Sequence, residues 1–137
     1  MLDFTDSALR LFLALIFGVI IGYSRRKYPA GIRTFALICL GTTIFTLISI
    51  SPNLSGAPNT NFDPTRVIAQ IVTGIGFIGA GVIWKSQAKL GGITTAAAVW
   101  AVAALGILIG LGEFGLAALT LLLILAVIYA KRVFPDI

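Results

Sequence analysis

The sequence contains no histidine and a single cysteine, Cys39. A disulfide bond within the chain is therefore excluded, and so is a zinc site built from cysteine and histidine. The chain also lacks the side chain that most often transfers protons near neutral pH. These two absences remove disulfide scaffolds, Cys/His metal sites and histidine-based acid–base chemistry from consideration.

Acidic residues are scarce as well, and the 137 residues include only Asp3, Asp6, Asp63, Glu113 and Asp136. No predicted membrane span contains one, so two carboxylates cannot meet inside the bundle as they do in an aspartyl dyad. The sequence also has no G-x-x-x-x-G-K-[ST] phosphate loop and no pair of serine and histidine. We therefore expect a protein that is not an enzyme and that carries no cofactor.

Apolar sequence, in contrast, is abundant: 58% of the residues are hydrophobic, 11% are charged, and the mean hydropathy is +1.05. Long apolar runs place the chain among multi-span membrane proteins. We predict an all-α, polytopic membrane helix bundle of five transmembrane helices that forms one domain, residues 1–137, with no soluble C-terminal domain. The predicted spans are residues 8–23, 34–50, 66–84, 94–111 and 115–130.

The basic residues predict the orientation of these spans in the membrane. Eight of the ten fall on one side of a five-span bundle, which is the cytoplasmic side by the positive-inside rule. The N-terminus is then outside and the C-terminus cytoplasmic. The net charge of +5 is explained by this topology, so we expect no nucleic-acid partner. The eight residues are Arg25, Arg26, Lys27, Arg33, Lys85, Lys89, Lys131 and Arg132, whereas Arg10 and Arg66 lie at the opposite boundary.

The third span carries a stripe of residues that is polar at its N-terminal end. At 100° per residue the stripe contains Arg66, Gln70, Thr73, Phe77, Ala80 and Trp84. Because lipid offers no hydrogen bonds, we expect this stripe to face other helices and the third span to be the central helix of the bundle. Glycines beside the stripe predict close helix packing, and we assign them to that role rather than to a dinucleotide site: Gly74, Gly76, Gly79 and Gly81.

The start of the third span allows two interpretations. Asp63 followed by Pro64 is typical of a helix N-cap with proline at the first helical position. Alternatively, Asp63, Arg66 and Gln70 form the mouth of a polar site at the outer surface. Asp63 is then the most plausible group to attract a cation such as Mg²⁺, although one carboxylate is a poor magnesium site.

A second set of polar residues lies at the opposite ends of the helices. Arg33 and Thr34 begin the second span, and Thr94 and Thr95 begin the fourth. They either snorkel and cap helices or form a buried polar cluster among spans two, three and four. Trp100 lies inside the fourth span, where its indole N–H should find an interior partner. The leucine-rich fifth span is expected to face lipid.

Four motifs in this order resemble the N-terminal membrane domain of the MgtC/SapB family. They are residues 30–34 (AGIRT), residues 63–66 (DPTR) with Gln70, residues 74–83 (GIGFIGAGVI), and residues 92–97 (GITTAA) with Trp100. The resemblance implies a five-span protein of the bacterial or archaeal cytoplasmic membrane. It also implies a role in growth under magnesium limitation and, in intracellular pathogens, in survival inside macrophages. Some members are described as inhibiting the proton-translocating ATP synthase, so that enzyme is an expected partner.

The sequence departs from the family pattern after the first span. The family typically has a glutamate in a Gly-x-Glu-Arg pattern, whereas Gly22-Tyr23-Ser24-Arg25 has a serine there. If that glutamate pairs with a basic residue in the family, Arg25 or Arg33 needs another partner in this chain.

Two functions remain open from the sequence. The first is a regulatory protein that acts by binding membrane partners, with a homodimer as one form. The second is a small transporter or channel for a cation or another solute, with its polar site at the outer end of the third span.

Overall fold

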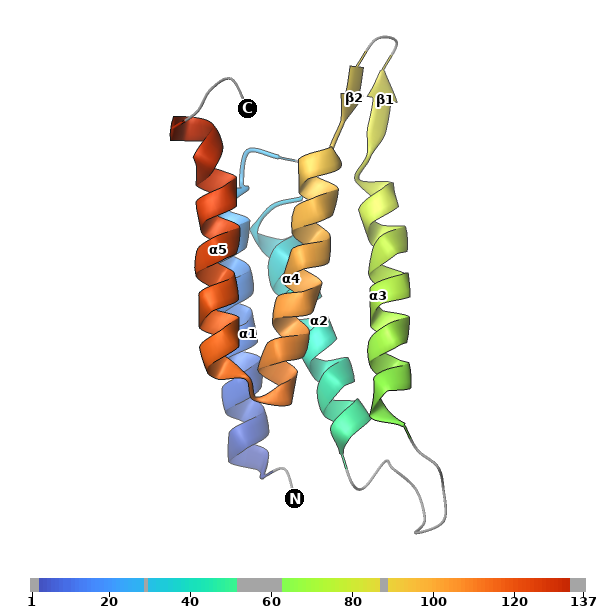
Figure 1. Ribbon diagram of the computed structural model, residues 1–137, viewed down its shortest axis with the longest axis vertical. Helices are drawn as coiled ribbons and strands as arrows, with labels where there is room; N and C mark the ends of the chain where they lie inside the picture. The colour runs from blue at the N-terminus through green and yellow to red at the C-terminus, as the bar shows by residue number, and fades with distance from the viewer. Residues whose placement is uncertain (1–2, 29, 52–62, 87–88, 134–137) are drawn as a thin grey trace.

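The structure is a computed structural model that describes residues 3–28, 30–51, 63–86 and 89–133. Five helices run alternately up and down, so the first and last described segments lie at opposite ends (Figure 1). They are α1 (Phe4–Ser24), α2 (Ile32–Ile50), α3 (Pro64–Gly81), α4 (Ile93–Leu111) and α5 (Phe114–Val133). Helices α1, α2 and α4 are long and apolar enough to cross a membrane. The predicted all-α membrane bundle is confirmed.

Helix α3 begins as the sequence predicts and ends earlier. The side chain of Asp63 accepts a hydrogen bond of 2.9 Å from the backbone N–H of Thr65, and Pro64 occupies the first turn, which confirms the N-cap. The helix stops at Gly81, three residues before the predicted end, Trp84. Val82 is its C-cap residue, and the chain is extended from Trp84 onward.

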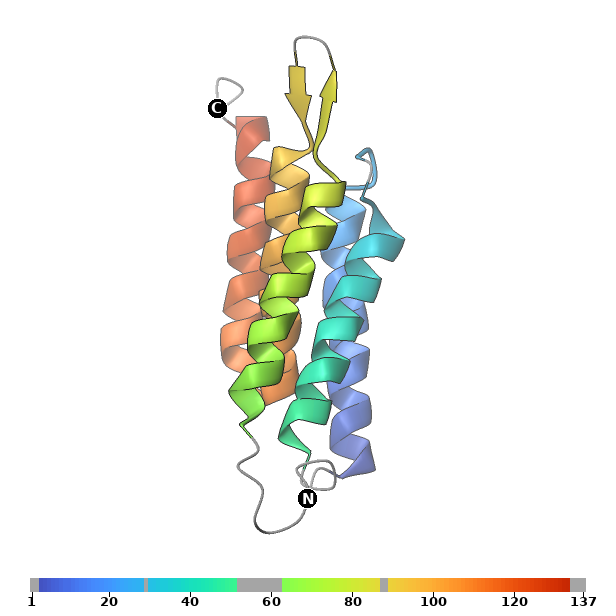
Figure 2. The same cartoon turned by 90° about the vertical axis from the view of Figure 1, so that its right-hand side faces the viewer.

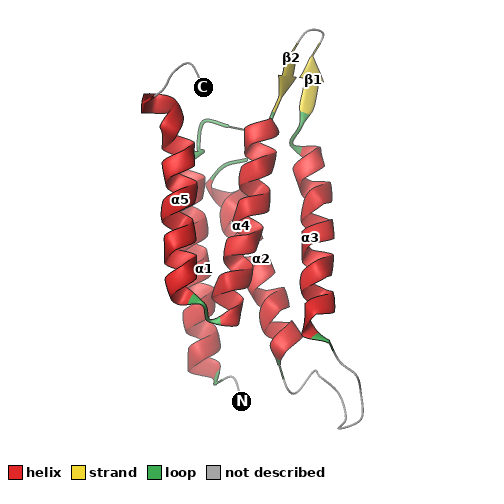
Figure 3. Cartoon of the chain, viewed as in Figure 1, coloured by secondary structure: helices red, strands yellow, loops and turns green. Residues whose placement is uncertain are grey.

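A short antiparallel hairpin, which the sequence analysis did not predict, joins α3 to α4 (Figure 3). Strand β1 (Trp84–Ser86) pairs with β2 (Lys89–Gly91), and Trp84 lies opposite Gly91. Gly92 follows with a φ of 86°, and a Cβ atom there would overlap the carbonyl oxygen of Val82. Glycine is the residue that adopts this conformation without steric cost, so Gly92 fixes the turn into α4.

The centre of the bundle is α4, which packs against each of the other four helices. Its Gly106 and Gly110 lie against α2, where a Cβ at Gly106 would stand 2.6 Å from the carbonyl oxygen of Cys39. The buried hydroxyl of Thr43 on α2 donates a hydrogen bond of 2.8 Å to the carbonyl of Gly106. Small residues and satisfied hydroxyls therefore bring α2 and α4 together.

Helix α3 lies at the edge of the bundle and packs mainly against α2 and α4 (Figures 1 and 2). Its buried side is a narrow stripe of Ile71, Ile75 and Gly79. The prediction that the third span is the central helix is therefore wrong. A polar stripe in a membrane must meet protein, but its composition does not say whether that protein is the same chain or another one.

Helix α5 covers the opposite side of α4. Ala117 and Leu121 are buried in the core, while Leu122 and Val127 are exposed. Its outward residues are apolar, as expected for a helix that faces lipid.

Candidate functional site

The polar stripe of α3 is exposed in the described chain, and within it Gln70 also borders the neighbouring helix α2. Arg66, Gln70 and Thr73 are exposed, and Phe77 is 84% exposed. Trp84 of the adjoining strand is exposed as well. We call these five residues the outer face of α3. Its position corrects the expectation that the stripe faces helices of the same chain.

The glycines beside this face are largely free of neighbours within the chain. A Cβ atom at Gly74, Gly76 or Gly81 would meet no other atom within 4 Å. Gly79 is the exception, because it lies against Ala96 of α4 at ordinary contact distance. Within the chain, Gly79 packs between helices, and the packing role of the other three stays a prediction.

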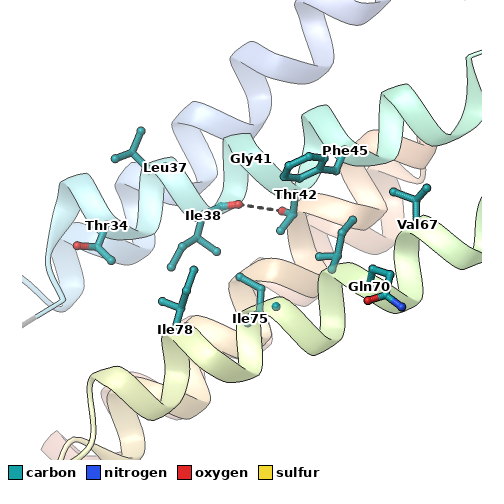
Figure 4. A pocket seen from close by; sticks show the side chains of 12 residues that line it. Thr34, Leu37, Ile38, Gly41, Thr42, Phe45, Val67, Gln70, Ile75 and Ile78 are labelled. Atoms are coloured by element: carbon teal, nitrogen blue, oxygen red, sulfur yellow. Dashed lines mark hydrogen bonds between the residues drawn. The ribbon is translucent and has the colours of Figure 1, made fainter. Parts of the chain in front are cut away.

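An apolar groove of about 580 Å³ runs between α2 and α3 (Figure 4). Most of its lining is aliphatic or aromatic, and the polar residues that line it are Thr34, Thr42 and Gln70. Thr42 donates its hydroxyl to the carbonyl of Ile38 at 3.0 Å and is satisfied internally (Figure 4). The groove therefore suits an apolar occupant rather than an ion.

The predicted outer mouth is an open surface at the end of the bundle that carries Asp3, Asp6, Asp63 and Glu113. We call it the acidic end. The Oδ1 atom of Asp63 accepts two hydrogen bonds from Thr65, one of 2.6 Å from its hydroxyl in addition to the N-cap bond. These hydrogen bonds, and then the charge of Arg66, lower the pKa of Asp63. Among the described residues, no group of three or more carboxylate, histidine or cysteine side chains could hold a metal ion.

Arg10 makes polar contacts at this end that the sequence did not suggest. Its guanidinium pairs with Asp6 at 2.6 Å and donates to the carbonyl of Gly110 at 2.6 Å. It therefore ties the start of α1 to the end of α4, a role consistent with the favourable position of a cation at a helix C-terminus. The sequence alone marked Arg10 only as a boundary residue.

The second predicted cluster lies at the opposite end, which carries Arg25, Arg26, Lys27 and Arg33 and which we call the basic end. Thr95 is buried there and accepts a hydrogen bond of 2.7 Å from the guanidinium of Arg25. Arg33 and Thr94 are exposed, and Thr34 is half-buried. The structure thus brings Thr95 into a buried polar contact whose basic partner is Arg25 rather than Arg33.

Arg25 is the functional candidate that the sequence analysis left out of its cluster. The sequence did point to Arg25, because Ser24 replaces the glutamate of the family pattern and a neighbouring basic residue then needs another partner. Ser24 does not substitute for that acid, since its hydroxyl donates to the carbonyl of Ile21 at 2.6 Å.

Trp100 is placed differently from the prediction too. It is 57% exposed on α4, so the prediction that its indole finds a partner in the interior is wrong.

Comparison with known proteins accounts for nearly the whole chain. A model of the MgtC family matches residues 11–136. The chain is 38% identical over 133 residues to an uncharacterized protein of Synechocystis sp., a match that covers 96% of this chain and 54% of that protein. It is 43% identical over 108 residues to Protein MgtC of Salmonella typhimurium, covering 77% of this chain and 44% of that protein. Identity to Protein MgtC of Brucella abortus is 42% over 116 residues, with 83% and 46% covered.

The chain spans about half the length of the curated relatives it matches. No solved structure matches it.

Proposed function

Because the chain belongs to the MgtC family, we propose that it is a regulatory protein of the bacterial or archaeal cytoplasmic membrane that acts by binding another membrane protein. Its role is adaptation to magnesium limitation. We propose that it is a binding protein and not an enzyme. The proton-translocating ATP synthase and a second copy of this chain are the partners that it names.

The exposed outer face of α3 carries this proposal. Gln70 brings an amide, and Thr73 a hydroxyl, to a surface that we place in the membrane as part of this proposal. Lipid cannot satisfy these groups, and an unsatisfied polar group there costs several kcal/mol. The hydroxyl of Thr73 donates back to the carbonyl of Ala69 at 3.2 Å. The amide of Gln70, with two donors and an acceptor, gains most from a partner helix.

The shape of the same face supports close contact with a helix. Phe77 stands out from α3 with glycines at positions 74, 76 and 81 around it. Small residues let the backbone of a partner approach, and a projecting aromatic ring supplies contact area. The groove between α2 and α3 lies beside the outer face and adds an apolar surface.

We further propose that the basic end is cytoplasmic. The connection after α1, the hairpin and the C-terminal end of α5 all lie at this end (Figure 1). These segments hold most of the basic residues, so the positive-inside rule places the C-terminus in the cytoplasm and the N-terminus outside.

Site-specific photocrosslinking tests the partner-binding role. Benzoylphenylalanine at position 77, on the outer face, should yield a crosslinked protein in cells starved of magnesium. The same label at position 122, on the exposed apolar side of α5, is the matched control and should yield little. Equal crosslinking at the two positions, or none at either, would count against the proposal.

Transport is not proposed. A conduit needs polar groups that face one another inside the bundle. The buried hydroxyls of Thr42, Thr43 and Thr46 are instead bonded to backbone carbonyls of α2 and α4.

A further inference from the structure

A pocket of about 770 Å³ opens at the basic end and is lined by residues from the end of α1, the start of α4 and the end of α5. Figure 1 shows that these three helix ends lie at the same end of the bundle. We call this cavity the basic pocket. Three consecutive cations line it, and Thr94 and residues 127–130 complete its wall. The cations are Arg25, Arg26 and Lys27, and Tyr23 and Tyr28 lie on either side of them in the sequence and line the same pocket.

Arg25 is a buried cation without a carboxylate partner among the described residues. It is 5% exposed, its guanidinium donates to Thr95, and it lies 4.0 Å from the centre of the Tyr28 ring. Its Nε atom is buried and has no hydrogen-bond partner. Burial lowers the pKa of Arg25 and the nearby Tyr28 opposes this, yet a guanidinium stays protonated in proteins. A buried positive charge is costly unless an anion balances it.

The surroundings of Arg25 add positive potential. Arg26 lies over the ring of Tyr23 at 4.3 Å, and Lys27 is exposed beside it. Gly92 is the N-cap residue of helix α4 and offers no side-chain cap, so the first turn of the helix presents the positive end of its dipole. The described carboxylates all lie at the acidic end, and Asp136 falls outside the described residues.

The apolar part of the pocket indicates which anion fits. Val127 is 73% exposed on α5 and lines the pocket together with Ile128. A phosphate group near the three cations would therefore have an apolar helix surface directly beneath it. Such a combination of basic and apolar surface at a helix end suits a lipid head group with its acyl chains.

We propose that the basic pocket binds the phosphate group of an anionic phospholipid, with Arg25 as its buried ligand and Arg26 and Lys27 as outer ligands. Arginine binds phosphate through charge-assisted hydrogen bonds from its N–H groups, and Arg25 lines this pocket. The acyl chains lie along the exposed side of α5 near Val127.

Native mass spectrometry of the detergent-solubilised protein tests this assignment, with phosphatidylglycerol, phosphatidylcholine or inorganic phosphate added. The wild type should retain phosphatidylglycerol preferentially. Arg25→Gln should reduce that retention about tenfold, as expected for a lost charge-assisted hydrogen bond. Arg33→Gln, at an exposed arginine of the same end that does not line the pocket, is the matched control and should leave retention unchanged.

Two further variants keep the test decisive if Arg25→Gln does not fold. Arg26→Gln and Lys27→Gln change exposed side chains and should each lower retention of phosphatidylglycerol severalfold. Equal retention of the two lipids by the wild type would overturn the proposal. So would inorganic phosphate that displaces phosphatidylglycerol at an equal concentration of phosphate groups, because the ligand would then be soluble. A rise in retention on Asp136→Asn, with little in the wild type, would show that Asp136 neutralises the pocket instead.

Discussion

The guanidinium of Arg25 donates a hydrogen bond of 2.7 Å to the hydroxyl of Thr95, which lies 70 positions later in the first turn of α4. This bond joins the end of the first helix to the start of the central one. Both side chains are buried. Two segments far apart in sequence therefore form one polar contact at the basic end, directly beside the pocket that we assign to a phosphate group.

The first prediction concerns this bond. Thr95→Val keeps the shape of the side chain and removes the acceptor of Arg25. The change should lower the free energy of unfolding by about 1–3 kcal/mol, because a buried charged donor loses its partner. Denaturant unfolding in detergent measures it. Thr94→Val, at an exposed position of the same turn, should change stability by less than about 0.5 kcal/mol.

The second prediction concerns the contact between α2 and α4. Gly106→Ala places a methyl group against Thr42 and 2.6 Å from the carbonyl oxygen of Cys39. The overlap should destabilise the bundle by about 1–3 kcal/mol. Gly74→Ala is the matched control, since a Cβ there meets nothing in the chain. Its stability should equal or slightly exceed that of the wild type because alanine favours helix.

The third prediction tests partner binding at the outer face of α3 with a change that should not alter the stability of the chain. Gly74→Leu fills the open space beside Phe77, so it should leave the melting temperature unchanged. Because a partner helix can no longer approach closely, recovery of the partner in co-purification from magnesium-starved cells should fall severalfold. Leu122→Ala, on the lipid-facing side of α5, should leave recovery unchanged. Unchanged recovery with Gly74→Leu would argue that partners bind elsewhere.

The fourth prediction is a pH dependence at the acidic end. Hydrogen bonds from Thr65 lower the pKa of Asp63 in the folded chain, so the stabilisation they give is present above the unfolded pKa of about 3.9. It is lost as the pH falls through the lower, folded pKa. Asp63→Asn preserves an N-cap that does not titrate. Helicity measured by circular dichroism should therefore decline less steeply below about pH 4 in this variant than in the wild type.

Much of the candidate site was visible in the residue pattern. Asp63, Pro64 and Thr65 predicted the N-cap because capping depends on local geometry alone. Thr95 was selected for its position at the start of a membrane helix. Arg25 was not selected, because its contact with Thr95 depends on how α1 and α4 are placed relative to each other. The pairing of β1 with β2 was missed, since Trp84 continues the stripe of α3 in the sequence.

Sequence alone determined the number of helices, their membrane character, the family and the separation of basic from acidic ends, because these depend on apolar run length and on the order of charges. Only the tertiary structure decided which helix is central. Both α3 and α4 carry glycines at spacings suited to close packing, but Gly106 and Gly110 meet threonines of α2 inside the chain, whereas Gly74 and Gly76 meet nothing. The difference is physical: a small residue creates room for a neighbour, and only the assembled helices determine whether that neighbour belongs to the same chain.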